Sequence, residues 1–230
     1  MRERVSPGMA VGIVAVAVFL VVSLLFGFTV VSDEEEAAFN VEFDPVAYVD
    51  GVWDNVRTTI KDEAVDLASI LGRLEPDADG NTPKEVLAPI VEEFGRVTPG
   101  DAHVYAVTTT GTVTDIDTEG LTRTMGLAVD GYDGPVDVRV YIGQRIPSAE
   151  TAVRDATGTI SFGDFKEQTE YGKVASEINK RVATGLADTD FEALEGERVQ
   201  ITGATMMRTQ NLVQIPVGEL LIVPTEVTTP

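Results

Sequence analysis

Residues 143–186 read GQRIPSAETAVRDATGTISFGDFKEQTEYGKVASEINKRVATGL, and this stretch decides how the rest of the chain is arranged. Three runs rich in β-branched residues precede it and two follow it. Its second half carries apolar residues at helical spacing, including Tyr171, Ile178 and Leu186. This spacing predicts an amphipathic helix over 165–187. The stretch is therefore expected to form a helix-bearing connection between the third and fourth strands of a sheet.

The flanking runs cover residues 103–117, 121–129, 136–142, 197–207 and 219–227. Gly111 lies inside the first run and predicts a bulge or bend there. The third run alternates, with Val136, Val138, Val140 and Ile142 on one face and Asp137, Arg139 and Tyr141 on the other. We predict an α+β fold, namely an OB-like, five-stranded, antiparallel, partly closed barrel with N-terminal helices. The alternative is an open antiparallel sheet with helices on one face.

An apolar segment precedes this domain, because residues 9–31 contain no charged side chain. A helix needs about 20 apolar residues to cross a bilayer core, so the segment is long enough to be a transmembrane anchor. Arginines lie before it and acids after it, which places residues 1–8 in the cytoplasm and the rest outside. The alternative is a signal peptide cleaved near Ser32 or Ala38.

Three further parts of the chain follow the apolar segment. Residues 32–42 form an acidic linker, residues 43–100 a helical part, and residues 101–230 the OB-like domain with its helix. Asp44 followed by Pro45 predicts a helix start, since aspartate caps helices and proline fits the first helical position. Asp164 is predicted to cap the later helix in the same way.

The composition excludes several classes of function. The formal net charge is −21, from 17 basic and 38 acidic residues, and such a surface repels nucleic acid. The chain has no cysteine, so it forms no disulfide and offers no thiolate ligand. His103 is the only histidine, and no residue pattern supplies it with a nucleophile. We therefore expect no catalysis, no metal and no cofactor.

Four polar residues of the central stretch are the candidates for a ligand site: Arg145, Arg154, Asp155 and Gln168. A guanidinium beside a carboxylate can recognise hydroxyl or carboxylate groups of a small molecule. The alternative interpretation of Arg154 and Asp155 is an internal ion pair that orients a loop, and this is the more common role of such pairs. Gln168 is expected one turn into the helix, facing either a pocket or water.

Several segments together resemble a family of predicted periplasmic lipoproteins of unknown function, DUF2291. They are residues 43–49 (FDPVAYV) with Trp53, residues 110–113 (TGTV), residues 142–156, residues 160–165 (ISFGDF) with Gln168, residues 194–196 (LEG) with Val199 and Gly203, and residues 222–224 (IVP). The resemblance extends from about residue 43 to residue 227. The chain departs from the lipoprotein pattern because it lacks the cysteine that carries the lipid.

The resemblance implies a role on the outer side of the membrane, because members of that family are often encoded beside sugar ABC transporters of the ribose type. It implies an accessory protein that contacts the permease or its substrate-binding protein. The alternative is an extracytoplasmic protein that binds a small ligand, a sugar or a nucleoside, without catalysis. The resemblance implies no catalytic residues.

Overall fold

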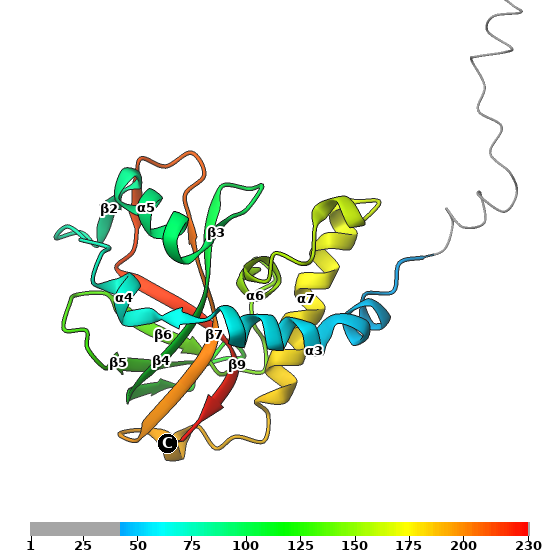
Figure 1. Ribbon diagram of the computed structural model, residues 1–230. Helices are drawn as coiled ribbons and strands as arrows, with labels where there is room; N and C mark the ends of the chain where they lie inside the picture. Colours follow the sequence, from blue (N-terminus) through cyan, green and yellow to red (C-terminus); the bar gives the residue numbers. More distant parts are fainter. Residues whose placement is uncertain (1–41, 230) are drawn as a thin grey trace, which may run out of the picture. The chain divides into compact units, whose positions relative to one another are not determined.

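The computed structural model describes residues 42–229. The predicted cytoplasmic residues 1–8, the predicted anchor over 9–31 and nearly all of the predicted linker therefore lie outside the described residues. Within residues 42–229, no helix has the length and hydropathy needed to cross a membrane. From Asp44 onward the chain is one compact unit, with helices packed against a strongly curved sheet (Figure 1).

Five strands of this sheet pair in a closed ring. They are β4 (Ala102–Asp117), β5 (Thr124–Val129), β6 (Asp137–Tyr141), β7 (Arg198–Arg208) and β9 (Glu219–Thr228). The pairing runs β4–β5–β6–β9–β7, and β7 pairs again with β4. The expected five strands are therefore present in a ring-like sheet, and the open-sheet alternative is wrong.

One pairing in the ring corrects the prediction of a wholly antiparallel sheet. Strands β6 and β9 run parallel, with Val138 opposite Leu220, whereas the other four pairings are antiparallel. The cause is the odd number of strands in the ring. Strand directions cannot alternate all the way around a ring with an odd number of members, so a closed ring of five strands must contain at least one parallel pair.

Strand β4 changes partner at Gly111, where the sequence predicts a bend. Residues 102–112 pair with β7 and residues 111–117 pair with β5, so Gly111 faces both Val199 and Val129. A Cβ on Gly111 would lie 2.4 Å from the carbonyl oxygen of Ala128. Glycine is required there because the backbones approach too closely for any side chain. A register irregularity follows between Val113 and Ile116.

The alternation in β6 is confirmed on its apolar side. Val136, Val138, Val140 and Ile142 are all buried, while Asp137 is exposed. Tyr141 is the exception on the opposite face, because it is only 5% exposed. The second face of β6 is therefore also covered at Tyr141.

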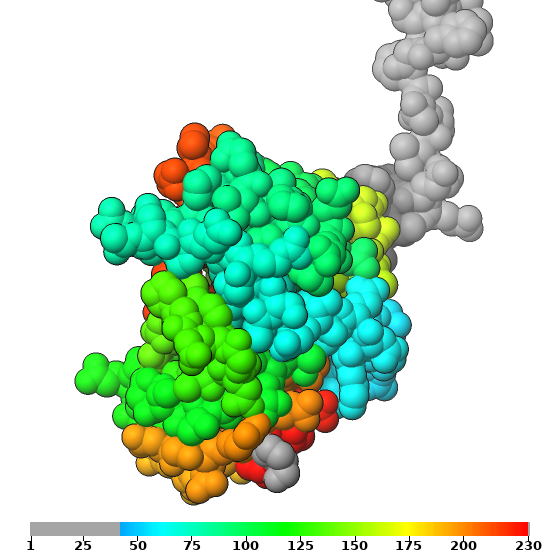
Figure 2. All heavy atoms as spheres, turned by 60° about the vertical axis from the view of Figure 1, so that its left-hand side comes forward, coloured from blue at the N-terminus to red at the C-terminus, as the bar shows by residue number. Residues whose placement is uncertain are grey.

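Helices cover part of the ring. They are α3 (Pro45–Glu63), α4 (Leu67–Leu71), α5 (Lys84–Phe94), α6 (Ala152–Ala156) and α7 (Gln168–Gly185). Helix α3 packs along α7, and α6 packs on β4 and β7. Figure 2 shows α3 to α5, in blue to teal, lying against the green and orange strands. Asp44 caps α3 as predicted, accepting hydrogen bonds from the backbone N–H groups of Val46 and Ala47 at 2.9 and 3.1 Å.

The start of α7 differs from its prediction. The helix begins at Gln168, and its N-cap residue Glu167 makes no capping hydrogen bond through its side chain. Asp164 instead closes a capping box with Ser161 around the short 3-10 helix η1 (Phe162–Asp164). This local bond removes Asp164 from the helix start, and η1 then presents Phe162 beside the first turn of α7.

Short strands and one further 3-10 helix complete the structure. Strands β1 (Val65–Asp66) and β3 (Arg96–Val97) add to β4, and β2 (Asn81–Pro83) pairs with β8 (Gln214–Pro216). The helix η2 (Glu192–Leu194) precedes β7. The β2–β8 pair ties the segment before α5 to the loop between β7 and β9.

Candidate functional site

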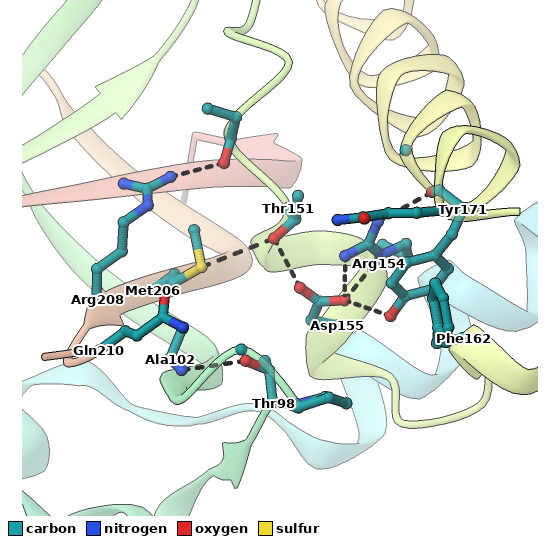
Figure 3. Close-up of a pocket in the computed structure, with 15 residues that line it drawn as sticks. Thr98, Ala102, Thr151, Arg154, Asp155, Phe162, Tyr171, Met206, Arg208 and Gln210 are labelled. Carbon is teal, nitrogen blue, oxygen red and sulfur yellow. Dashed lines mark hydrogen bonds and ion pairs between the residues drawn. The ribbon is translucent and has the colours of Figure 1, made fainter.

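A cavity of about 620 Å³ opens between the end of β7 and the helices α6 and α7. A volume of this size suits a small organic ligand. Three parts of the chain line it: the turn before β4 (Thr98, Pro99, Gly100, Ala102), the α6–α7 region (Ala149, Thr151, Arg154, Asp155, Phe162, Gln168, Tyr171, Gly172) and the end of β7 (Met206, Arg208, Gln210). Figure 3 shows the last two groups facing each other.

Arg154 and Asp155 form a buried ion pair on the α6 side. Both side chains are 7% exposed, and the Nε and Nη2 atoms of Arg154 each lie 2.7 Å from Oδ1 of Asp155. The Nη1 atom of Arg154 donates to the backbone oxygen of Tyr171 at 2.9 Å. The arginine thus joins α6 to α7, which is the structural role that the sequence left open beside ligand binding.

Two hydroxyl groups complete the shell around Asp155. Thr151 donates to Oδ2 at 2.6 Å, and the Tyr171 hydroxyl donates to Oδ1 at 2.9 Å. Burial, followed by the charge of Asp155, raises the pKa of Tyr171 to about 12, so Tyr171 keeps the proton that it donates. Each carboxylate oxygen of Asp155 already accepts hydrogen bonds, and neither is positioned as a free base.

Aromatic rings extend from this pair to the mouth of the cavity. The guanidinium carbon of Arg154 lies 3.5 Å from the centroid of the Tyr171 ring, a cation–π contact. The Phe162 ring meets the Tyr171 ring edge to face, with centroids 5.6 Å apart. The centroid of the Phe165 ring lies 5.5 Å from that of Tyr171. Phe162 remains 47% exposed and therefore offers a ring to the cavity.

The opposite wall carries a second arginine. Arg208 ends β7, and its Nη2 atom donates to the backbone oxygen of Ala149 at 2.6 Å. Glu150, the next residue, is 7% exposed, and its Oε1 atom has no hydrogen-bond partner. Burial raises the pKa of Glu150, and the charge of Arg208 opposes this rise. Arg208 nevertheless forms no ion pair with any described carboxylate.

The four predicted candidates separate into two places. Arg154, Asp155 and Gln168 line the same cavity. Arg145 does not; it lines a smaller cavity of about 260 Å³ beside Gln144 and Lys180. Arg208, Phe162 and Tyr171 were missed. One signal for Arg208 was present in the sequence. Arg208 directly follows the fourth predicted strand, residues 197–207, and is therefore a cation at the end of a strand.

His103 lies on β4 next to Ala102 and is not among the residues that line the cavity. Its side chain is 4% exposed, its Nδ1 atom has no hydrogen-bond partner, and burial lowers its pKa. Across residues 42–229, no group of three or more histidine, cysteine, aspartate or glutamate side chains is arranged to hold a metal ion. The polar groups that line the cavity are arginine, amide and hydroxyl groups and the paired carboxylate of Asp155, and aromatic rings lie beside them.

Comparison with solved structures defines the class of fold. An OB-fold protein from Thermotoga maritima, solved by crystallography, matches 82% of this chain and 99% of its own with a TM-score of 0.58 and 17% identity. At this identity the likeness shows the fold alone, a mixed α+β structure related to OB-fold proteins. The chain belongs to the DUF2291 family of predicted periplasmic lipoproteins, whose model matches residues 15–224. No functionally curated protein matches it.

Family membership indicates a membrane-associated protein outside the cytoplasm, and the activity of the family is unknown. The absence of cysteine from this sequence means that it departs from the family's description as lipoproteins.

Proposed function

We propose that this protein is a membrane-anchored, extracytoplasmic accessory protein of a ribose-type sugar ABC uptake system, acting by contact with the permease or its substrate-binding protein. Residues 9–31 form the single-pass anchor in this proposal, and the ring-like sheet is an OB-type, partly closed barrel held outside. The observation that carries it is family membership over residues 15–224 in a chain that has an uncharged segment of bilayer length but no cysteine for a lipid.

The topology is tested with a tag on the C-terminus of the full-length chain. In intact spheroplasts, added protease is expected to remove the tag, while the anchored fragment stays in the membrane pellet. A tag that resists protease until the spheroplasts are lysed would contradict the topology. Full-length protein that washes out of intact spheroplasts would contradict the anchor.

The contact with a transporter is tested separately by affinity capture of the full-length chain in mild detergent. Anchoring raises the local concentration near a permease, so a weak contact is sufficient in the cell. Chemical cross-linking before solubilisation is therefore included. Recovery of a sugar ABC permease or its binding protein is expected, and consistent recovery of neither would argue against this role.

A non-catalytic role is part of the proposal. It is supported by the state of the polar groups at the cavity, where Arg154, Thr151 and Tyr171 all bond to Asp155. A general base needs access to the proton that it removes. Both carboxylate oxygens of Asp155 already accept hydrogen bonds from the protein, so a substrate has little access to them. His103 is buried and does not line the cavity.

A second candidate function is the binding of a small ligand, a sugar or a nucleoside, and the cavity of about 620 Å³ favours it. A ligand that binds only the folded state raises its melting temperature. We expect at least one member of a panel of pentoses, hexoses and nucleosides to do so. The Gln168→Ala variant should weaken that response, while Arg145→Gln, outside the cavity, should not. A flat response to the whole panel would exclude these neutral ligands.

A further inference from the structure

Most of the arginines in residues 42–229 form ion pairs. Those in ion pairs are Arg73, Arg96, Arg123, Arg139, Arg154, Arg181 and Arg198. The other arginines of residues 42–229 are Arg57, Arg145 and Arg208. With 38 acidic residues and 17 basic ones in the chain, carboxylates are abundant, so an arginine that lacks one is a feature to explain.

Arg208 differs from the other two in what surrounds it. Arg57 lines two cavities, and Glu226 lines both of them, so an acid shares its surroundings. Arg145 lines a cavity of about 260 Å³ that has no aromatic wall. Arg208 lines the cavity of about 620 Å³, where the one acidic side chain in the lining is Asp155, already paired with Arg154. The Glu150 carboxylate is near enough to feel the charge of Arg208, but it is buried, does not line the cavity and forms no ion pair with Arg208.

Arg208 is an exposed residue whose guanidinium makes one hydrogen bond within the described residues. Its strand is fixed by pairing with β4, where Arg208 lies opposite Ala102, and the Thr209 hydroxyl bonds to the backbone oxygen of Asp101. Of the five N–H donors of a guanidinium, one has a protein acceptor here, at Ala149. A planar guanidinium whose other donors face solvent can pair with a carboxylate through two parallel hydrogen bonds.

The wall of the cavity opposite Arg208 suits a ring of a ligand rather than a second charged group. Phe162 is half-exposed, is held by the η1 capping box, and packs on Tyr171. Figure 3 shows Phe162 and Tyr171 on the side of the cavity opposite Arg208. The Gln168 and Gln210 amides line the cavity as well, and amides serve hydroxyl groups as donors or acceptors. The positive charge, the amides and the aromatic face together describe a small, ring-shaped anion.

We propose that the cavity binds a small organic acid whose carboxylate pairs with Arg208 and whose ring lies against Phe162. This rests on the second candidate function and narrows it from a neutral ligand to an anionic one. The shared chemistry is a carboxylate on a six-membered ring, which an aromatic acid and a sugar acid both provide. Both kinds of ligand therefore enter the test.

The experiment uses the full-length chain in mild detergent and two matched pairs of probes, benzoate with benzamide and glucuronate with glucose. Calorimetric titration and thermal shift are measured at constant ionic strength, with inorganic phosphate as a further arm. We expect at least one carboxylate to bind about tenfold or more tightly than its neutral partner, since hydrogen bonds to charged groups are the stronger class. Phosphate is expected to bind more weakly than that carboxylate, because it has no ring to pack on Phe162.

Variants identify the groups responsible. Arg208→Gln is expected to lose about tenfold or more in affinity for the carboxylate and none for the neutral partner, and Arg208→Lys to fall between. Phe162→Ala should also lower the affinity for the carboxylate probe. Arg145→Gln is the matched control, an unpaired arginine outside the cavity, and should change nothing. Circular dichroism without ligand shows that each variant folds.

The outcomes separate this inference from the proposal beneath it. If glucose binds as tightly as glucuronate and Arg208→Gln leaves both unchanged, the cavity binds a neutral ligand and the anionic assignment is wrong. If phosphate alone binds through Arg208, the ring assignment is wrong. If neither carboxylate binds, the inference is overturned whatever the neutral panel shows, whereas a flat neutral panel beside a bound carboxylate supports it.

Discussion

The replacement Asp155→Asn should destabilise the protein more than an ordinary substitution. The Asp155 side chain is 7% exposed and accepts contacts from Arg154, Tyr171 and Thr151 at 2.6–2.9 Å. Asparagine keeps the shape but removes the charge, and it leaves the Arg154 guanidinium buried against Tyr171 without a counter-charge. Breaking a buried pair from one side costs about 3–5 kcal/mol. We expect the free energy of unfolding to fall by an amount in this range.

A double-mutant cycle shows whether the loss belongs to the pair. Arg154→Met should cost less than Asp155→Asn, because Asp155 retains its bonds from Thr151 and Tyr171. The double variant leaves no unpaired charge, so it should cost less than the sum of the single changes, with a coupling of about 2 kcal/mol. Urea unfolding of the full-length chain, followed by circular dichroism, measures all four proteins. Strict additivity, or a loss below about 1 kcal/mol for Asp155→Asn, would refute the assignment of this pair as the α6–α7 link.

Three further predictions concern other sites. Burial raises the folded-state pKa of Glu150, so the wild type should lose stability as pH rises above about 4.5. The melting temperature of Glu150→Gln relative to wild type should therefore increase with pH, and a difference independent of pH would contradict this. Gly203→Ala would place a Cβ 2.3 Å from the Val223 oxygen and should cost about 1–3 kcal/mol in urea unfolding, unlike Gly163→Ala, which meets nothing within 4 Å. Asp44→Ala removes the α3 cap and should cost about 1 kcal/mol by the same measurement, and no loss would show that the helix end is held by other contacts.

Local patterns predicted the elements because each pattern has a local physical cause. The alternation of Val136 to Ile142 reflects one buried face of β6, and the glycine at 111 reflects a backbone approach too close for a side chain. Asp44 and Pro45 begin a helix through bonds within four residues. Asp164 shows the limit of such reasoning, because a serine three residues earlier gave it a competing local partner.

The sequence was a poorer guide to which distant strands pair and in which direction they run. Nothing in residues 136–142 or 219–227 shows that the two strands run parallel, since side-chain alternation is the same in both directions. The same difficulty affects the site. Arg154 and Asp155 are adjacent in the chain, so their pairing was open to prediction, whereas Arg208 reaches the cavity from more than fifty residues away. Arg145 lies close to them in sequence and still faces a different cavity, because sequence proximity does not fix the direction of a loop side chain.

The two arginines of the cavity should therefore give opposite readouts. Arg154 has its charge neutralised, its edge bonded to Tyr171 and its face on the Tyr171 ring, so its replacement should change stability first. Arg208 has one backbone acceptor and no carboxylate, so its replacement should change affinity while the melting temperature without ligand stays nearly constant. Thr151 connects the two walls, since its hydroxyl donates to Asp155 at 2.6 Å and approaches the Met206 sulfur at 3.7 Å. A ligand that spans Arg208 and Phe162 would thus bind across the same gap that Thr151 bridges, and its binding should stabilise the contact between α6 and β7.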